Sequence, residues 1–164
     1  MKGFTLIELI IYSAIISLFL VVASAFAWQI IQGSLKAEAY QEVEQNANFS
    51  LGKIVHALRN SSEVVEPNKS GESSSQLRLN MQDAVKTPTI FEIAGQSLTI
   101  KEGGTGPFSL TSDLVEIANL NFTNLSFSNS ETIRIEITVE RFNPSGRSGY
   151  EAAINLETTV NLNK

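Results

Sequence analysis

The feature that most restricts this chain is an uncharged run near its N-terminus. Residues 9–28 are 20 consecutive positions without Asp, Glu, Lys or Arg. A helix of that length can cross the hydrocarbon core of a bilayer. Ser13, Ser17 and Ser24 lie inside the run, where a serine hydroxyl can bond back to a carbonyl of its own helix. The run therefore predicts one membrane-spanning helix.

After Trp28 the composition is that of a soluble protein, rich in Asn, Ser, Thr and Glu. A chain of 164 residues has room for one modest domain beside the anchor. It contains no cysteine, which excludes a disulfide framework, a zinc–thiolate site and a cysteine nucleophile. Residues 63–164 carry 8 basic and 13 acidic groups without a run of Lys or Arg, so we expect no direct nucleic-acid binding.

Three interpretations compete for residues 1–28. In a secretory signal peptide, the A-x-A site at 25–27 would make Trp28 the first residue of the mature chain. In a plain signal anchor, the segment would stay uncut in the membrane. The third interpretation rests on the string Lys2-Gly3-Phe4-Thr5-Leu6-Ile7-Glu8-Leu9, which closely resembles the leader and first residues of type IV pilins and type II secretion pseudopilins.

That resemblance implies processing at two residues and a role in assembly for a third. The prepilin peptidase would cut between Gly3 and Phe4 and then methylate the new N-terminus of Phe4. In the resembling family, the glutamate that corresponds to Glu8 meets the N-terminal amine of a neighbouring subunit as the helices pack into a filament. We therefore expect Glu8 to act in assembly.

Physical reasoning about Glu8 separates the three interpretations. An acidic side chain at the centre of a membrane helix costs about 2.5–3.5 kcal/mol, and less toward an end. A signal peptide and a plain anchor gain nothing that offsets this cost. Pairing with an amine would neutralise both groups and set the axial register between subunits. A simpler role, an acid favoured by the helix dipole and by the chain's own Phe4 amine, is compatible with this one.

The helical pattern continues beyond the membrane segment. Apolar residues recur every three or four positions from Leu35 to Leu58, and no proline precedes Pro67. A continuous helix from Phe4 to Asn60 would be roughly 85 Å long. Gly33 and Gly52 are its weak points, and Gly33 is the expected place for a bend. The expected parts are a leader at 1–3, a membrane and filament-core half at 4–31, an amphipathic half at 32–62 and a β domain at 63–164.

The β domain shows a period of two. Residues 76–82, a hairpin over 90–101 and residues 133–139 and 152–162 alternate apolar and polar side chains. We expect residues 66–75 and 103–107 to be loops, and a bulge or tight turn near Thr123-Asn124. Short turns between successive strands predict one antiparallel sheet with one face on the helix, which makes the fold class α+β. The order of these elements is similar to that of minor pilins and J-like minor pseudopilins.

No residue pattern indicates an enzyme, a cofactor or a metal site. His56 is the only histidine and has no acid spaced for a triad or a metal pair, so we expect it on the helix surface or at a helix–sheet contact. The glycines at 103–106 are followed by Pro107 and a strand, not by a phosphate-binding helix. Trp28 lies where an interfacial anchor belongs, and Tyr40 is expected on the helix surface.

The resemblance thus implies a structural subunit of a type IV pilus, a competence pilus or a type II secretion pseudopilus, with a minor subunit favoured. Its partners would be other pilin or pseudopilin subunits, the prepilin peptidase and the inner-membrane assembly platform. Before assembly it would lie in the inner membrane as a single-pass protein, with its N-terminus cytoplasmic and its C-terminal domain extracytoplasmic. The alternative is a membrane-anchored or secreted binding module that does not polymerise.

Overall fold

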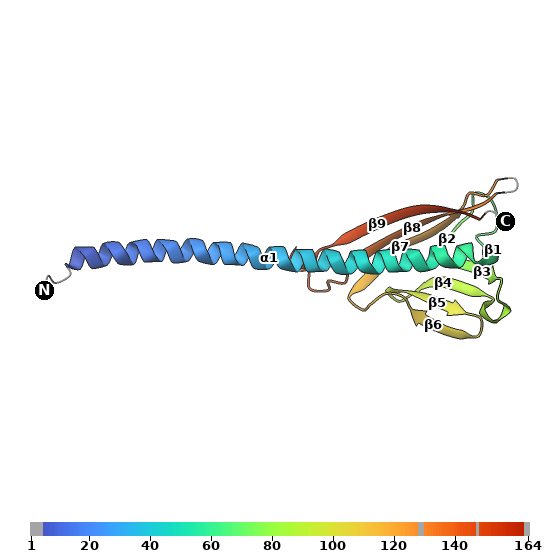
Figure 1. Cartoon of the computed structure of the whole chain (residues 1–164), viewed down its shortest axis with the longest axis horizontal. Helices are drawn as coiled ribbons and strands as arrows, with labels where there is room; N and C mark the ends of the chain where they lie inside the picture. The colour runs from blue at the N-terminus through green and yellow to red at the C-terminus, as the bar shows by residue number, and fades with distance from the viewer. Residues whose placement is uncertain (1–4, 128–129, 147, 163–164) are drawn as a thin grey trace.

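A single long helix carries a β domain on its second half, and its first half is bare (Figure 1). The computed structural model describes residues 5–127, 130–146 and 148–162. Helix α1 spans Leu6–Arg59, 54 residues, which corresponds to about 81 Å. It runs through Gly33 and Gly52 without interruption, and Asn60 caps its C-terminus by donating its backbone N–H to the carbonyls of the last turn.

The second half of α1 buries the apolar stripe that the sequence predicts. Ala39, Val43, Ala47, Ile54 and Leu58 are buried, and Leu35, Leu51 and Val55 are half-buried. This face packs chiefly against two strands of the β domain. The stripe also contains a polar residue, because Ser50 is fully buried and its hydroxyl has no hydrogen-bond partner among the described residues.

The first of two sheets has five antiparallel strands in the order β1-β3-β4-β5-β6. Their bounds are β1 Ser61–Glu66, β3 Leu77–Met81, β4 Thr89–Ala94, β5 Ser97–Glu102 and β6 Thr105–Ser109. The predicted hairpin is confirmed: Ala94 faces Ser97, and Gly95 makes the turn with a φ of 67°. The alternating segment at 76–82 is also confirmed, as β3.

One expectation for this part of the chain is wrong, and one strand was not expected. The glycine-rich segment at 103–107 is not a loop, because Thr105 pairs with Glu102 and the chain returns along β5 as strand β6. Gly103 makes that turn with a φ of 55°, donates its N–H to the Pro88 carbonyl at 2.9 Å, and leaves no room for a Cβ against the Val85 carbonyl oxygen. Strand β1 was not predicted at all, since its residues show no clean alternation.

The second sheet has four antiparallel strands in the order β2-β7-β8-β9. Their bounds are β2 Ser73–Ser74, β7 Val115–Asn124, β8 Glu131–Arg141 and β9 Ala153–Leu162. The two C-terminal strands confirm the alternation in the sequence, and they pair from Glu131–Leu162 to Glu140–Ala153 without a register shift. The expected 66–75 loop is broken by β2, which pairs with Thr123 and Phe122 of β7.

The bulge expected near Thr123-Asn124 is also wrong, because the register of β7 shifts between Ile117 and Asn119. The misleading signal came from Asn124, which occupies a buried position of the strand although it is polar. Its side-chain amide donates to the Pro67 carbonyl at 2.9 Å, and its side-chain oxygen accepts from the Ser126 N–H at 2.9 Å. The sequence therefore loses its alternation there while the strand itself stays regular up to Asn124.

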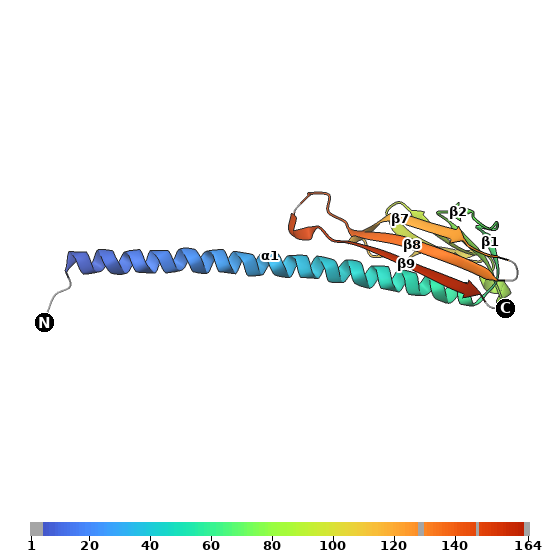
Figure 2. The same cartoon turned by 90° about the horizontal axis from the view of Figure 1, so that it is seen from above.

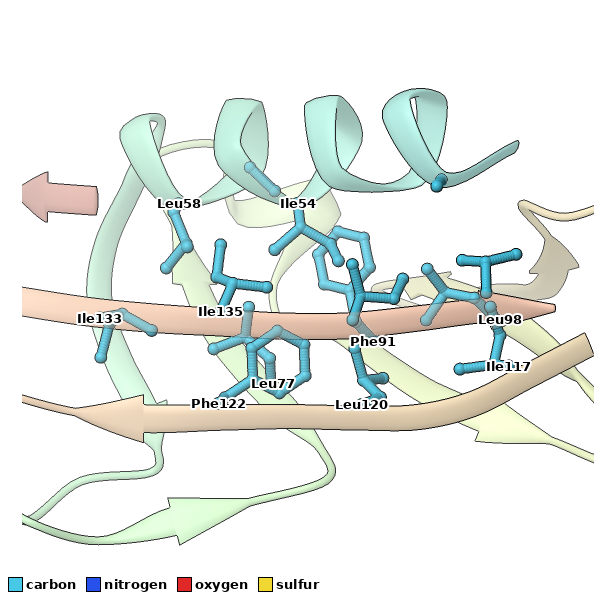
Figure 3. Packing of buried hydrophobic residues seen from close by; sticks show 14 of the residues in the cluster. Ile54, Leu58, Leu77, Phe91, Leu98, Ile117, Leu120, Phe122, Ile133 and Ile135 are labelled. Atoms are coloured by element: carbon cyan, nitrogen blue, oxygen red, sulfur yellow. The ribbon is translucent and has the colours of Figure 1, made fainter. Parts of the chain in front are cut away.

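The core lies between α1 and the two sheets. Figure 3 shows Ile54 and Leu58 of the helix facing Ile135 of β8, with Leu77, Phe91 and Phe122 packed around them. Each such fully buried side chain contributes about 1.5–3 kcal/mol. The predicted α+β class, with a long helix packed on antiparallel strands as in a pilin, is confirmed, but the strands form two sheets where one was expected.

The helix and the sheets are also joined by hydrogen bonds outside the core. Ser112, in the loop before β7, donates its backbone N–H to the side-chain oxygen of Asn46 at 2.9 Å. Its hydroxyl donates to the Glu42 carboxylate at 3.0 Å. These bonds join residues that are distant in the sequence and fix the loop against the helix.

Candidate functional site: the N-terminal segment

The N-terminus of α1 is closed by a reciprocal pair of side chains. Thr5 is the N-cap, with extended backbone angles of −84° and 151°. The Glu8 N–H donates to the Thr5 hydroxyl oxygen at 3.4 Å. Oε2 of Glu8 accepts from the Thr5 backbone N–H at 2.9 Å and from the Thr5 hydroxyl at 2.8 Å. This arrangement is a capping box, which satisfies N–H groups that the helix leaves without partners.

Thr5 is the residue of this site that sequence reasoning missed. A Ser or Thr followed three positions later by an acid, before an apolar run, is the signature of a capping box. Residues 5–8 have this pattern, so it was available in the sequence. The other two predicted site residues, Gly3 and Phe4, lie outside the described residues, and the proposed cleavage between them stays a prediction.

The segment behind the cap precedes the part of α1 that has buried residues. All residues from 5 to 31 are exposed, and they form a helix long and apolar enough to cross a membrane (Figure 2). The three serines in the run bond to carbonyls of their own helix: Ser13 to Ile10 at 2.9 Å, Ser17 to Ser13 at 2.7 Å and Ser24 to Leu20 at 2.8 Å. Each hydroxyl is therefore satisfied without water, as a membrane interior requires.

Glu8 is the only charged residue in this exposed apolar half. None of the ion pairs between described residues includes Glu8, which is held only by its bonds to Thr5. The segment thus presents a long apolar surface with one acid at its end. Chemically, such a surface can pack against lipid or other helices, and its acid can accept a hydrogen bond from a cation.

The other residues considered in the sequence lie away from this segment. His56 is exposed on α1, with its ring nitrogens 3.3–3.4 Å from the side-chain nitrogen of Asn60. Tyr40 is on the helix surface, where the Lys36 ammonium lies 5.9 Å from its ring centre. Trp28 is 64% exposed near the end of the apolar run. In the part of the chain that the structure describes, no group of three or more His, Asp or Glu side chains could hold a metal ion.

Comparison with known proteins identifies the N-terminal segment. The model of the prokaryotic N-terminal methylation motif matches residues 1–24. No curated protein and no solved structure matches the chain. The matched residues include Gly3, Phe4, Thr5 and Glu8 and extend into the exposed apolar half of α1. The chain therefore carries a type IV pilin-like prepilin leader in front of a single helix that fits a membrane anchor.

Proposed function

We propose that this protein is a structural subunit, of the minor class, of a type IV pilus, a competence pilus or a type II secretion pseudopilus. The observation that carries the proposal is the methylation motif at residues 1–24, which includes the start of one uninterrupted helix. The first half of that helix is bare and apolar, and the second half is covered by the sheets. Such a subunit has one part that can pack into a shaft and one part that stays folded beside it.

The proposed work of the protein is mechanical, not catalytic. A contact that one copy makes with the next, repeated along an axis without closing, produces a helical fibre. The bare half of α1 provides a surface for such a contact with other pilin or pseudopilin subunits. Before assembly it would anchor the chain in the inner membrane, where the prepilin peptidase and the assembly platform act on it. The N-terminus would then be cytoplasmic and the β domain extracytoplasmic.

Glu8 would link neighbouring subunits through its carboxylate. Both bonds from Thr5 end on Oε2, so Oε1 can accept from the methylated Phe4 amine of a neighbour while the cap stays in place. In an apolar bundle the acid and the amine compensate each other, whereas either one alone would be costly to bury. The pair would then fix how far one helix is displaced along the next.

The intact mass of the purified protein tests the processing. We expect a chain that begins at Phe4 and carries one added methyl group on its amine. A chain that begins at Met1 would indicate a plain anchor, and one that begins at Trp28 would indicate a cleaved signal peptide. Either result would reject the pilin proposal and favour a binding module that does not polymerise.

Glu8→Gln tests the assembly role. We expect normal cleavage after Gly3 but reduced incorporation into filaments, because the amide cannot neutralise the neighbour's amine. Glu38→Gln is the matched control, since Glu38 is exposed on the part of α1 beyond the apolar run. Equal incorporation of both variants, measured in sheared filament fractions, would contradict the pairing.

A further inference from the structure

The outer edge of β9 differs from the other sheet edges of this protein. An edge strand exposes a row of unpaired N–H and C=O groups and is a template for another strand unless it is protected. We infer that β9 is a pairing site for an extended segment of a different protein, with a basic side chain placed next to Glu157. This inference goes beyond the proposed function, because it does not require cleavage or polymerisation.

The other edges of the described sheets are all protected. Strand β6 has Pro107 in its middle, and proline has no N–H to donate. Strand β1 pairs with β3 through a register that shifts twice, and Pro67 follows it directly. Strand β2 is only two residues long and covers only Phe122 and Thr123 of β7. The rest of the β7 edge has a register shift between Ile117 and Asn119, and the Ile117 N–H donates to the Gln96 carbonyl at 2.9 Å. Bulges, prolines and short length are the usual means by which proteins prevent edge-to-edge pairing.

Strand β9 has none of these protections. It is 10 residues long and pairs with β8 at every position without a shift. Its sequence contains no Pro, Gly or Lys, and its one charged residue is Glu157. Figure 1 shows β9 as the outermost strand of its sheet, with no other described strand on its outer side. A second strand could therefore extend the sheet along this edge.

The side chains of β9 favour a segment that alternates apolar and polar residues. Ile154 and Leu156 point to the helix side of the sheet but are only half-buried. Asn155, Glu157 and Thr159 point to the opposite face and are exposed. An added strand with apolar residues on the helix side would cover Ile154 and Leu156, and polar residues would match the outer face.

The charges on the outer face specify a basic partner residue. Glu157 lies directly opposite Glu136 on β8, an arrangement of like charges that is unfavourable in a sheet. The Nε of Arg134 lies 3.2 Å from the Glu157 carboxylate, whereas Glu136 accepts a hydrogen bond from the uncharged side-chain amide of Asn121 at 2.9 Å. The group of three side chains therefore keeps one net negative charge beside the free edge. A Lys or Arg on the added strand, facing Glu157, would neutralise it.

A second copy of this chain is a poor occupant of the edge. The strands at the sheet edges of the copy, β1, β2, β6, β7 and β9, contain no Lys or Arg that could face Glu157. Two β9 edges related by a two-fold axis perpendicular to the sheet would, in addition, join antiparallel. Strand β9 runs in the same direction as α1 (Figure 2). Antiparallel pairing would point the two apolar helix halves in opposite directions, so both could not enter one membrane. The occupant is therefore a segment of another protein.

Hydrogen exchange of the full chain in lipid nanodiscs tests the inference. The probe is a nine-residue synthetic peptide that alternates threonine and valine with lysine at its centre, so that the lysine lies on the threonine face. At saturating peptide we expect backbone amides of β9 to exchange at least about tenfold more slowly, because its outward N–H groups become paired. Amides of β6 should not change.

The charge requirement is tested with a matched peptide and a matched variant. The same peptide with glutamate at its centre should bind the native chain roughly 1.5- to 5-fold more weakly, as expected for an exposed ion pair. In the Glu157→Lys variant the new lysine lies opposite Glu136, which is compatible with folding. This variant should bind the peptide with central glutamate more tightly than the peptide with central lysine. Equal affinity of the native chain for both peptides would contradict the claim that the partner has a basic residue facing Glu157.

Two other results would overturn the edge assignment itself. One is the absence of protection in β9, or protection that is equal in β6. The other is protection of β9 without peptide that increases with protein concentration, which would show that a second copy occupies the edge. None of these readouts depends on Glu8 or on cleavage after Gly3, so failure here is distinguishable from failure of the proposed function.

Discussion

The Glu8 carboxylate has partners in the isolated subunit. Its bonds to the N–H and hydroxyl of Thr5 close the first turn of α1. An acid placed in an apolar segment needs such partners, because water is absent from the bilayer interior. The capping box therefore lets one residue stabilise the helix end and remain available to a neighbour. This dual use links a local helix signal to the proposed assembly.

Thr5→Val should weaken the helix end while Thr5→Ser should preserve it. Valine lacks the hydroxyl that accepts from the Glu8 N–H and donates to its carboxylate, whereas serine keeps it. Loss of an N-cap costs about 0.5–2 kcal/mol. Amide exchange of the first turn in detergent should therefore be faster in the valine variant. Equal exchange in the two variants would show that the cap does not hold the turn.

Ser50→Ala should stabilise the protein. The hydroxyl of Ser50 is fully buried and has no partner among the described residues, and an unsatisfied buried group costs about 1–3 kcal/mol. Alanine also has a higher helix propensity, worth no more than about 0.5 kcal/mol. Urea unfolding of the detergent-solubilised chain should give a gain of about 1 kcal/mol or more. A loss of stability would show that the hydroxyl is satisfied.

At the scale of elements, α1 is one helix with two environments. Residues up to 31 are exposed and apolar, and from Leu35 onward one face is covered by β8 and β9. The pairing of the strands depends on the turns that connect them. The β5–β6 turn brings Gly103 against the backbone of Val85, in the segment before β4. This close contact lies in a region that the sequence suggested was a loop.

Gly103→Ala should destabilise the first sheet much more than Gly104→Ala. Gly103 has a φ of 55°, and a Cβ there would collide with the Val85 carbonyl oxygen. A Cβ added to Gly104 would have no atom of another part of the chain within 4 Å, and Gly104 has no positive φ. We expect a loss of about 1–3 kcal/mol for the first variant and less than about 1 kcal/mol for the second. Similar unfolding midpoints for the two variants would contradict this assignment of the turn.

At the scale of the whole molecule, the bare half of α1 and the β domain are separable. Gln32 is the first described residue of the helix that is half-buried, and buried residues begin at Ala39. The core lies between the second half of α1 and the two sheets (Figure 3). We therefore expect the domain to be stable without the anchor.

Removal of the anchor should give a soluble, folded domain. We expect a chain that begins at Gln29 to be monomeric and to unfold cooperatively. A chain that begins at Gln45 loses Ala39 and Val43 from the core, a loss of about 2–4 kcal/mol, and should melt roughly 10 °C lower. Circular dichroism melts and sedimentation measure both. Aggregation of the longer chain would show that the anchor contributes to folding.

The sequence by itself determined the parts that depend on local periodicity. The uncharged run and the stripe from Leu35 to Leu58 identified α1, because a helix places residues three and four apart on one face. Strict alternation identified β8 and β9, because successive side chains of a strand point to opposite faces of the sheet. Glu8 is recognisable in the sequence because an acid in an apolar run is unusual. The motif around it is also recognisable, because its residues are contiguous.

Only the tertiary structure decided the features that depend on distant contacts. Strand β2 exists because Ser73 and Ser74 meet Thr123 and Phe122 of β7, and Asn124 is buried because it bonds to Pro67. The division into two sheets and the bonds from Ser112 to the helix depend on residues that are far apart in the chain. Such pairings have no local period, so no pattern in the sequence could reveal them.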